Sequence, residues 1–267
     1  MIPWEEAWRM VADTIMPLCP IHAGLTDLAG LVLAEDVVAR ENMPPFDAAR
    51  MDGYAVIAAD MAPRKRVLGE QCAGNVIGVR LTPGSAIRIM TGAPLPYGAD
   101  AVVPVEHTSE KDGMMSSARA VLPGENVRRA GQDIAVGDLV ITQGSILGPV
   151  EIGLLASLGY SQALVYPRPR VTVMATGDEL VSLDQPLGPG QIRESNAFAL
   201  CAAVQIAGGV ARRAERTGDN EAALRAALLQ AVQEADMVVT SAGVSMGTRD
   251  LVKPVLASLG TIHFGRV

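Results

Sequence analysis

From residue 170 onward the chain alternates between apolar runs and helix-like segments, and this alternation constrains the fold more than any other feature. Asn196 and Asp219 stand where helix N-caps belong, and Gly260 stands where a C-terminal cap belongs. Strands that alternate with helices form parallel sheets, so the sequence predicts a parallel α/β domain over residues 167–267. The expected strands are 171–176, 210–216, 236–241 and 261–264, and the expected helices are 196 onward, 219–234 and 249–259.

The first expected strand ends in an acidic turn that contains glycine. Thr176-Gly177-Asp178-Glu179 follows the apolar run, and aspartates follow the next expected strands at Asp219 and Asp250. Open α/β sheets bind ligands outside the carboxyl ends of their strands. The three turns are therefore expected to form one acidic crevice, suited to a phosphate-rich ligand with a divalent metal. The simpler interpretations are a surface carboxylate at Glu179 and a helix cap at Asp219.

The first two thirds of the chain predict a different architecture. The apolar spacing from Pro3 to about Met16 predicts an amphipathic helix, and residues 28–38 are expected to form a second helix. From Pro44 short apolar runs broken by Pro and Gly favour a β-rich module. The fold class expected is thus α/β and multidomain. Its parts are a discontinuous helical or mixed domain over 1–43 and 127–166, an inserted β-rich domain over 44–126, and the α/β domain over 167–267.

Composition disfavours several classes of function. Aromatic residues make up 3% of the 267 residues and the net charge is -7, which disfavours both base-stacking platforms and general nucleic-acid binding. Cys19, Cys72 and Cys201 form no C-x-x-C pair, which disfavours a disulfide framework and fits a reducing, cytoplasmic setting. The N-terminus lacks the pattern of a signal peptide, and no apolar run is long enough to span a bilayer.

Three polar motifs of the first two thirds contain candidate site residues. Asp52 lies in the segment 46–56, which could also be an ordinary Asp-Gly turn. Thr91 and Gly92 could supply a hydroxyl and N–H groups to an anion. Arg128 lies beside a second arginine in the segment 126–133, and this pair suits bidentate phosphate recognition, with a solvated charged loop as the equal alternative.

A fourth motif, in the α/β segment, suggests a different chemistry. Gly243-Val244-Ser245-Met246-Gly247 matches the nucleophile elbow of serine hydrolases, between an expected strand and an expected helix. The elbow requires an Asp and then a His, and only Asp250 and His263 follow, close to the end of the sequence. A serine hydrolase is therefore the disfavoured alternative. The three histidines are isolated from one another, so a zinc site is not indicated.

Taken together and in order, these motifs resemble the molybdopterin molybdenumtransferase family, which includes MoeA and the E domain of gephyrin. The resemblance covers essentially the whole chain. It rests on Met51-Asp52-Gly53-Tyr54-Ala55-Val56, Ile89-Met90-Thr91-Gly92-Ala93-Pro94, Gly98-Ala99-Asp100-Ala101-Val102-Val103, Arg128-Arg129-Ala130-Gly131-Gln132-Asp133, Thr176-Gly177-Asp178-Glu179-Leu180, Gly190-Gln191-Ile192-Arg193-Glu194-Ser195-Asn196 and Gly243-Val244-Ser245-Met246-Gly247 with Asp250.

The resemblance implies the last step of molybdenum cofactor synthesis. In that step molybdate is inserted into adenylated molybdopterin, and AMP is released with the help of Mg²⁺. It implies further that the partners are a second copy of the chain, as a homodimer, and a molybdopterin adenylyltransferase. The residues it assigns are Asp52, Glu179 and Asp250 as catalytic, Thr91, Gly92, Arg128, Asp133, Asp219 and Ser245 as substrate-binding, and Glu179 and Asp250 as ligands of the metal.

The chain also departs from the family pattern. Ala48-Ala49-Arg50 replaces a small polar turn and adds a positive charge, and Ala242 stands where the family usually has glycine. The family continues beyond Val267 into a Lys-Pro-Gly segment, so the α/β domain is expected to be incomplete in this sequence. The alternative function is accordingly a non-catalytic molybdopterin-binding or scaffold paralogue that lacks this segment.

Overall fold

The structure, a computed structural model, describes residues 1–218, 220–241, 251–265 and 267. The chain divides into two compact units. The first comprises Met1–Ala23, Gly30–Ala34 and Leu164–Val267, and the second comprises Gly24–Ala29 and Glu35–Ala163. The first unit contains a parallel α/β sheet and the second a β-rich module, which confirms the predicted fold class.

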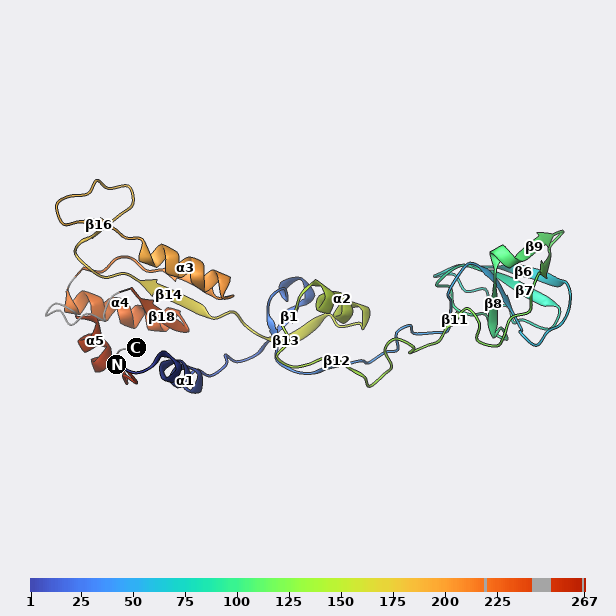
Figure 1. Cartoon of the computed structure of the whole chain (residues 1–267), viewed down its shortest axis with the longest axis horizontal. Helices are drawn as coiled ribbons and strands as arrows, with labels where there is room; N and C mark the ends of the chain where they lie inside the picture. Colours follow the sequence, from blue (N-terminus) through green and yellow to red (C-terminus); the bar gives the residue numbers. More distant parts are fainter. Residues whose placement is uncertain (219, 242–250, 266) are drawn as a thin grey trace. The chain divides into compact units, whose positions relative to one another are not determined.

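The α/β part of the first unit is built on a parallel sheet with the order β17-β14-β18. Figure 1 labels β14 and β18 of this sheet and the helices α3, α4 and α5 of the same part. Helix α3 packs on one face of β14, where Val173 and Ala175 are buried. Helices α4 and α5 pack on the other face, around Met174. The elements of this part are β14 (Arg170–Met174), β15 (Leu180–Val181), β16 (Ile192–Arg193), α3 (Asn196–Ile206), β17 (Val210–Arg213), α4 (Glu221–Glu234), β18 (Met237–Thr240) and α5 (Val252–Leu259).

The remainder of the first unit is a helix and a small sheet. Helix α1 (Trp4–Thr14) confirms the predicted amphipathic helix, and Ala7 is its buried residue, whereas Trp4 and Trp8 are exposed. The sheet has the order β1-β13-β2, and β13 is antiparallel to β2. Its strands are β1 (Ile21–Gly24), β2 (Val32–Leu33) and β13 (Gln162–Tyr166).

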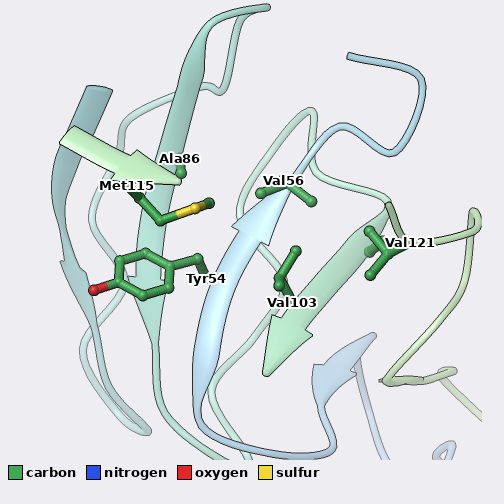
Figure 2. Close-up of a cluster of buried hydrophobic side chains, with 7 residues drawn as sticks. Tyr54, Val56, Ala86, Val103, Met115 and Val121 are labelled. Carbon is green, nitrogen blue, oxygen red and sulfur yellow. The ribbon is translucent and has the colours of Figure 1, made fainter. Parts of the chain in front are cut away.

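A six-stranded sheet with the order β8-β5-β7-β6-β10-β9 forms the main body of the second unit. Tyr54, Val56 and Val103 pack with Met115 in one of its buried clusters (Figure 2). The strands are β5 (Gly53–Val56), β6 (Lys65–Gln71), β7 (Ser85–Ile89), β8 (Ala101–Pro104), β9 (Thr108–Lys111) and β10 (Met114–Ser117). The unit also contains η1 (Leu25–Asp27), β3 (Val37–Val38), β4 (Ala48–Ala49), η2 (Val105–His107), β11 (Val127–Arg128), β12 (Leu139–Ile141) and α2 (Pro149–Ser157).

The helix predicted over residues 28–38 is wrong. Gly30 has a φ of 75° and ends the local turn, and β2 and β3 follow it. Leu31 and Leu33 are buried with a more exposed residue between them, which is the two-residue period of a strand. The apolar residues of this segment are therefore buried by strands and not by one face of a helix.

Three details of the α/β part also differ from prediction. Ser195, not Asn196, is the N-cap of α3, and Asn220 caps α4 by accepting a hydrogen bond from the Ala223 N–H at 2.9 Å. Asp219 itself lies outside the described residues. Residues 261–264 form no strand, and they line an apolar hollow with Leu228 and Leu256 instead. The predicted strand over 261–264 is therefore wrong, since these mostly exposed residues pair with no strand of the described residues.

Candidate functional site

Residues from three of the predicted motifs line one hollow in the second unit. The hollow has a volume of about 430 Å³. Two backbone pairings bring the motifs together, because β4 is antiparallel to β11 and Ala48 also forms a bridge with Pro94. The lining residues are Pro44, Phe46, Ala48, Ala49, Arg50, Thr91, Gly92, Arg128, Gln132 and Asp133.

Asp52 lies next to this hollow and holds Thr91. Its Oδ1 accepts hydrogen bonds from the hydroxyl and from the backbone N–H of Thr91, each at 2.7 Å. These two bonds outweigh desolvation and lower the pKa of the Asp52 carboxyl below its ordinary value. Gly53 follows because a Cβ at that position would lie 2.0 Å from the carbonyl oxygen of Val103. The two residues therefore have different roles: Gly53 allows the close approach of the neighbouring strand, and the Asp52 carboxylate anchors Thr91.

The turn that carries Thr91 and Gly92 is fixed from both sides. Gly92 has a φ of 79° and donates its N–H to the carbonyl of Ala49 at 2.9 Å. On the other side Gln71, which is fully buried, donates from Nε2 to the carbonyl of Pro94. The donors that sequence reasoning assigned to an anion, the Thr91 hydroxyl and the two N–H groups, are thus already engaged within the protein.

The guanidiniums of the arginine motif both have carboxylate partners. Arg128 forms an ion pair with Asp133, and Arg129 forms one with Asp47. Asp47 also accepts a hydrogen bond from the Ala130 N–H at 2.8 Å, and this bond, with the Arg129 guanidinium, lowers the pKa of the Asp47 carboxyl against the effect of burial. The segment is therefore a charged loop whose Arg128, Gln132 and Asp133 also line the hollow.

The acidic turn of the first unit lies at the carboxyl end of β14, as predicted. Thr176 forms a parallel bridge with Thr217, so the turn after β14 runs beside the segment after β17. Asp178 and Glu179 are exposed there. The predicted turn after β14 thus adjoins the described part of the segment that follows β17. Asp219, Ser245 and Asp250, predicted from the same pattern, lie outside the described residues.

Several residues with evident roles around these sites were not among the predicted ones. Arg50 and Gln132 line the hollow, and Gln71 braces its Thr91 turn. In the first unit Glu194, 5% exposed, accepts a hydrogen bond from the Ala197 N–H at the start of α3 at 2.6 Å. The sequence contained one signal for Arg50, which is its charge within an otherwise small and apolar turn.

The metal chemistry available within the described ranges is limited. No three His, Cys, Asp or Glu side chains among these residues come together as a metal-binding group. Asp178 and Glu179 are exposed carboxylates of the kind that Mg²⁺ sites use, in which one or two carboxylates bind the ion and substrate phosphates and water complete its shell. Among the helices of the described residues, none has both the length and the apolar character that crossing a bilayer requires.

Two family models match the chain. Residues 2–159 match the MoeA N-terminal region (domain I and II), and residues 172–267 match a probable molybdopterin binding domain. Together they account for both halves of the sequence.

Individual proteins agree with these matches. A molybdopterin molybdenumtransferase 2 of Mycobacterium tuberculosis (strain ATCC 25618 / H37Rv) is 42% identical over 261 residues, which cover 95% of this chain and 64% of that protein. A molybdopterin molybdenumtransferase of Haemophilus influenzae is 37% identical, with 97% and 65% covered. A crystal structure of a molybdopterin biosynthesis MoeA protein from Pyrococcus horikosii matches with a TM-score of 0.86 and 33% identity, over 97% of this chain and 67% of that one. The chain thus spans about two thirds of the length of these relatives.

Proposed function

The chain belongs to the MoeA family of molybdopterin molybdenumtransferases, as its motifs predicted, and we propose that it inserts molybdate into adenylated molybdopterin and releases AMP. Its place in molybdenum cofactor biosynthesis follows from the family. The reaction and the substrates are inferred from relatives of which the chain spans about two thirds.

One observation carries the proposal. Segments that are distant in sequence converge so that Thr91, Arg128 and Asp133 line the same hollow, with Asp52 hydrogen-bonded to Thr91. An adenylated pterin contains a pyrophosphate, which needs guanidinium donors, and Arg128 offers one at the wall of the hollow. Thr91 and Gly92 shape that wall, because their N–H groups are engaged within the protein.

The carboxylates have two proposed roles. Asp52, kept ionised by Thr91, positions the substrate or a group that reacts with it. In the first unit, Glu179 and Asp178 are the described carboxylates that would hold Mg²⁺. Asp250, outside the described residues, is proposed from the sequence as a further ligand of the ion. Mg²⁺ would neutralise charge that develops on the phosphate oxygens. Asp219 and Ser245 remain proposed substrate-binding residues.

The proposed partners follow from the same family. We expect a homodimer in the cytoplasm, supplied with adenylated molybdopterin by a molybdopterin adenylyltransferase. Nucleic acid is not an expected ligand, because the chain has a net charge of -7 and few aromatic residues.

The proposal is tested by incubating the protein with adenylated molybdopterin and Mg²⁺, with and without molybdate. AMP is quantified by chromatography, and the pterin retained by the protein is measured after ultrafiltration. A transferase releases AMP in a molybdate-dependent manner. A binding or scaffold protein retains the intact adenylated pterin and releases no AMP, which would replace the proposed function with the alternative one.

A further inference from the structure

Arg50 contributes a guanidinium to the hollow, and no carboxylate of the described residues pairs with it. Its side chain is exposed and lines the hollow, and no ion pair or hydrogen bond to it occurs among the described residues. In contrast, Arg128 pairs with Asp133, and the nearby Arg129 pairs with Asp47. Of these three arginines Arg50 alone can therefore bind an anion without first exchanging a partner.

The backbone holds Arg50 at the wall of the hollow. Its N–H donates to the carbonyl of Asn126 at 3.0 Å. It directly follows β4, whose residues Ala48 and Ala49 are buried and paired with β11. Arg128 is the second residue of β11, the strand that pairs with β4. Arg50, directly after β4, and Arg128 therefore line the same hollow. Ala48 and Ala49 line the same hollow with their small side chains.

The state of the other hydrogen-bond donors of the hollow also favours Arg50 as the anion-binding residue. The hydroxyl and N–H of Thr91 are bound to Asp52, and the N–H of Gly92 is bound to Ala49. Gln132 accepts a hydrogen bond from the Arg129 N–H through Oε1, and no partner of its amide nitrogen occurs within the described ranges. The open donors are therefore the Arg50 guanidinium and the Gln132 amide, with Arg128 available once Asp133 is displaced.

We propose that Arg50 is a substrate-binding residue that contacts a phosphate group of the ligand, with Arg128 and Gln132 completing the contact. The inference rests on the proposed function for the identity of the ligand, a pyrophosphate-bearing nucleotide conjugate. A guanidinium presents its N–H donors in a planar fork that matches two phosphate oxygens. A pyrophosphate, which has two phosphate groups, can engage Arg50 and Arg128 together.

Calorimetric titration with inorganic pyrophosphate tests this role in the wild type and in three variants. Arg50→Ala should weaken binding by about tenfold or more, because it removes a charged hydrogen-bonding group. Arg50→Lys should restore part of the affinity, because it keeps the charge but loses the fork. Arg64→Ala is the matched control, since Arg64 is exposed in the same unit, carries the same charge and does not line the hollow. It should bind pyrophosphate like the wild type.

Three results would overturn the inference. They are a wild type that does not bind pyrophosphate, an Arg50→Ala variant that binds it as tightly as the wild type, and an Arg64→Ala variant whose affinity falls as much as that of Arg50→Ala. Thermal unfolding of each variant checks that the fold is kept. The AMP-release assay is a separate measurement. Loss of pyrophosphate binding in Arg50→Ala without AMP release by the wild type would reject the proposed function and keep the anion site.

Discussion

Asp52 and Thr91 are joined by two hydrogen bonds to a single oxygen, Oδ1 of Asp52, from the Thr91 hydroxyl and the Thr91 N–H, each 2.7 Å long. The two residues are 39 positions apart in sequence, so the pair ties the β5 turn to the turn that lines the hollow. Since an ionised carboxylate is the stronger acceptor, the link is strongest when Asp52 is charged.

The link should therefore depend on pH. The pKa of Asp52 is lowered in the folded protein by the Thr91 hydroxyl and N–H, so the stabilisation is present above the ordinary carboxyl pKa and is lost as the pH falls through the lowered value. Hydrogen exchange at the Thr91 amide, followed by NMR, should lose its protection over that acidic range. Asp52→Ala should lack the protection at every pH, whereas Asp52→Asn should keep it. Equal protection in the wild type and in Asp52→Ala would contradict the link.

The Asp60–Lys65 pair should make the second unit sensitive to acid. Both side chains are less than a tenth exposed, and the Lys65 ammonium lies 2.7 Å from Oδ2 of Asp60. Burial alone would raise the pKa of Asp60, but hydrogen bonds from Lys65 and from the N–H groups of Gly84 and Ala62 lower it from 3.8 to about 2. The stabilisation is thus complete above the unfolded pKa and is lost as the pH falls towards about 2.

Urea unfolding at a series of acidic pH values measures this effect. The free energy of unfolding of the wild type should fall with pH more steeply than that of Asp60→Asn. Glu125→Gln is the control, because the Arg119–Glu125 pair is far more exposed and such surface pairs contribute about 1 kcal/mol or less. Parallel pH profiles for the wild type and Asp60→Asn would show that the buried pair does not cause the acid sensitivity.

Two glycines of the motifs should respond differently to alanine. A Cβ at Gly53 would lie 2.0 Å from the Val103 carbonyl oxygen, and backbone atoms of a sheet cannot move aside cheaply. Gly53→Ala should therefore cost about 3 kcal/mol or more. Gly92→Ala meets open space but must keep a φ of 79°, which costs about 1 kcal/mol. Denaturant midpoints measure both, and an equal loss in the two variants would refute the steric explanation.

Gln71 should support the Thr91 turn although it lies outside the hollow. It is fully buried, donates to the Pro94 carbonyl and accepts from the Ile77 N–H at 3.1 Å. Gln71→Met keeps the volume but leaves two backbone groups without partners, so we expect a loss of about 3 kcal/mol and faster hydrogen exchange in residues 90–94. Gln132→Met, at an exposed position, is the control and should be close to neutral. Unchanged exchange in Gln71→Met would remove its supporting role.

The sequence predicted the architecture where its periodicity was clear. Strands and helices alternate from Arg170 to Leu259 as expected, and the central strand β14, whose buried residues pack against helices on both faces, carries the clearest apolar signal. The segment 28–38 was mistaken for a helix because its leucines fit both periods, and the left-handed Gly30 decided between them. Residues 261–264 have apolar spacing typical of a strand but form no strand. The spacing of residues in the sequence does not show whether a neighbouring strand is present to pair with them.

The candidate site was predictable in its members but not in its bonding. The motifs indicated Thr91 and Arg128, and the family resemblance implied Asp133; the structure brings all three to one hollow. It could not show that Thr91 donates both its protons to Asp52, or that Arg128 is paired, because these contacts depend on tertiary placement. For the same reason the sequence shows Arg50 only as an unusual positive charge. Its place in the hollow, and its lack of a carboxylate partner among the described residues, require the structure.

Molybdate-dependent release of AMP from adenylated molybdopterin, compared between the wild type and Asp52→Asn, bears most directly on the proposed function. The wild type should release AMP when molybdate and Mg²⁺ are present. Asp52→Asn should lose this turnover while its melting temperature stays close to that of the wild type, since the asparagine oxygen can still accept from Thr91. Binding of the adenylated pterin by the wild type without AMP release, or full turnover by Asp52→Asn, would contradict the proposed role of this site.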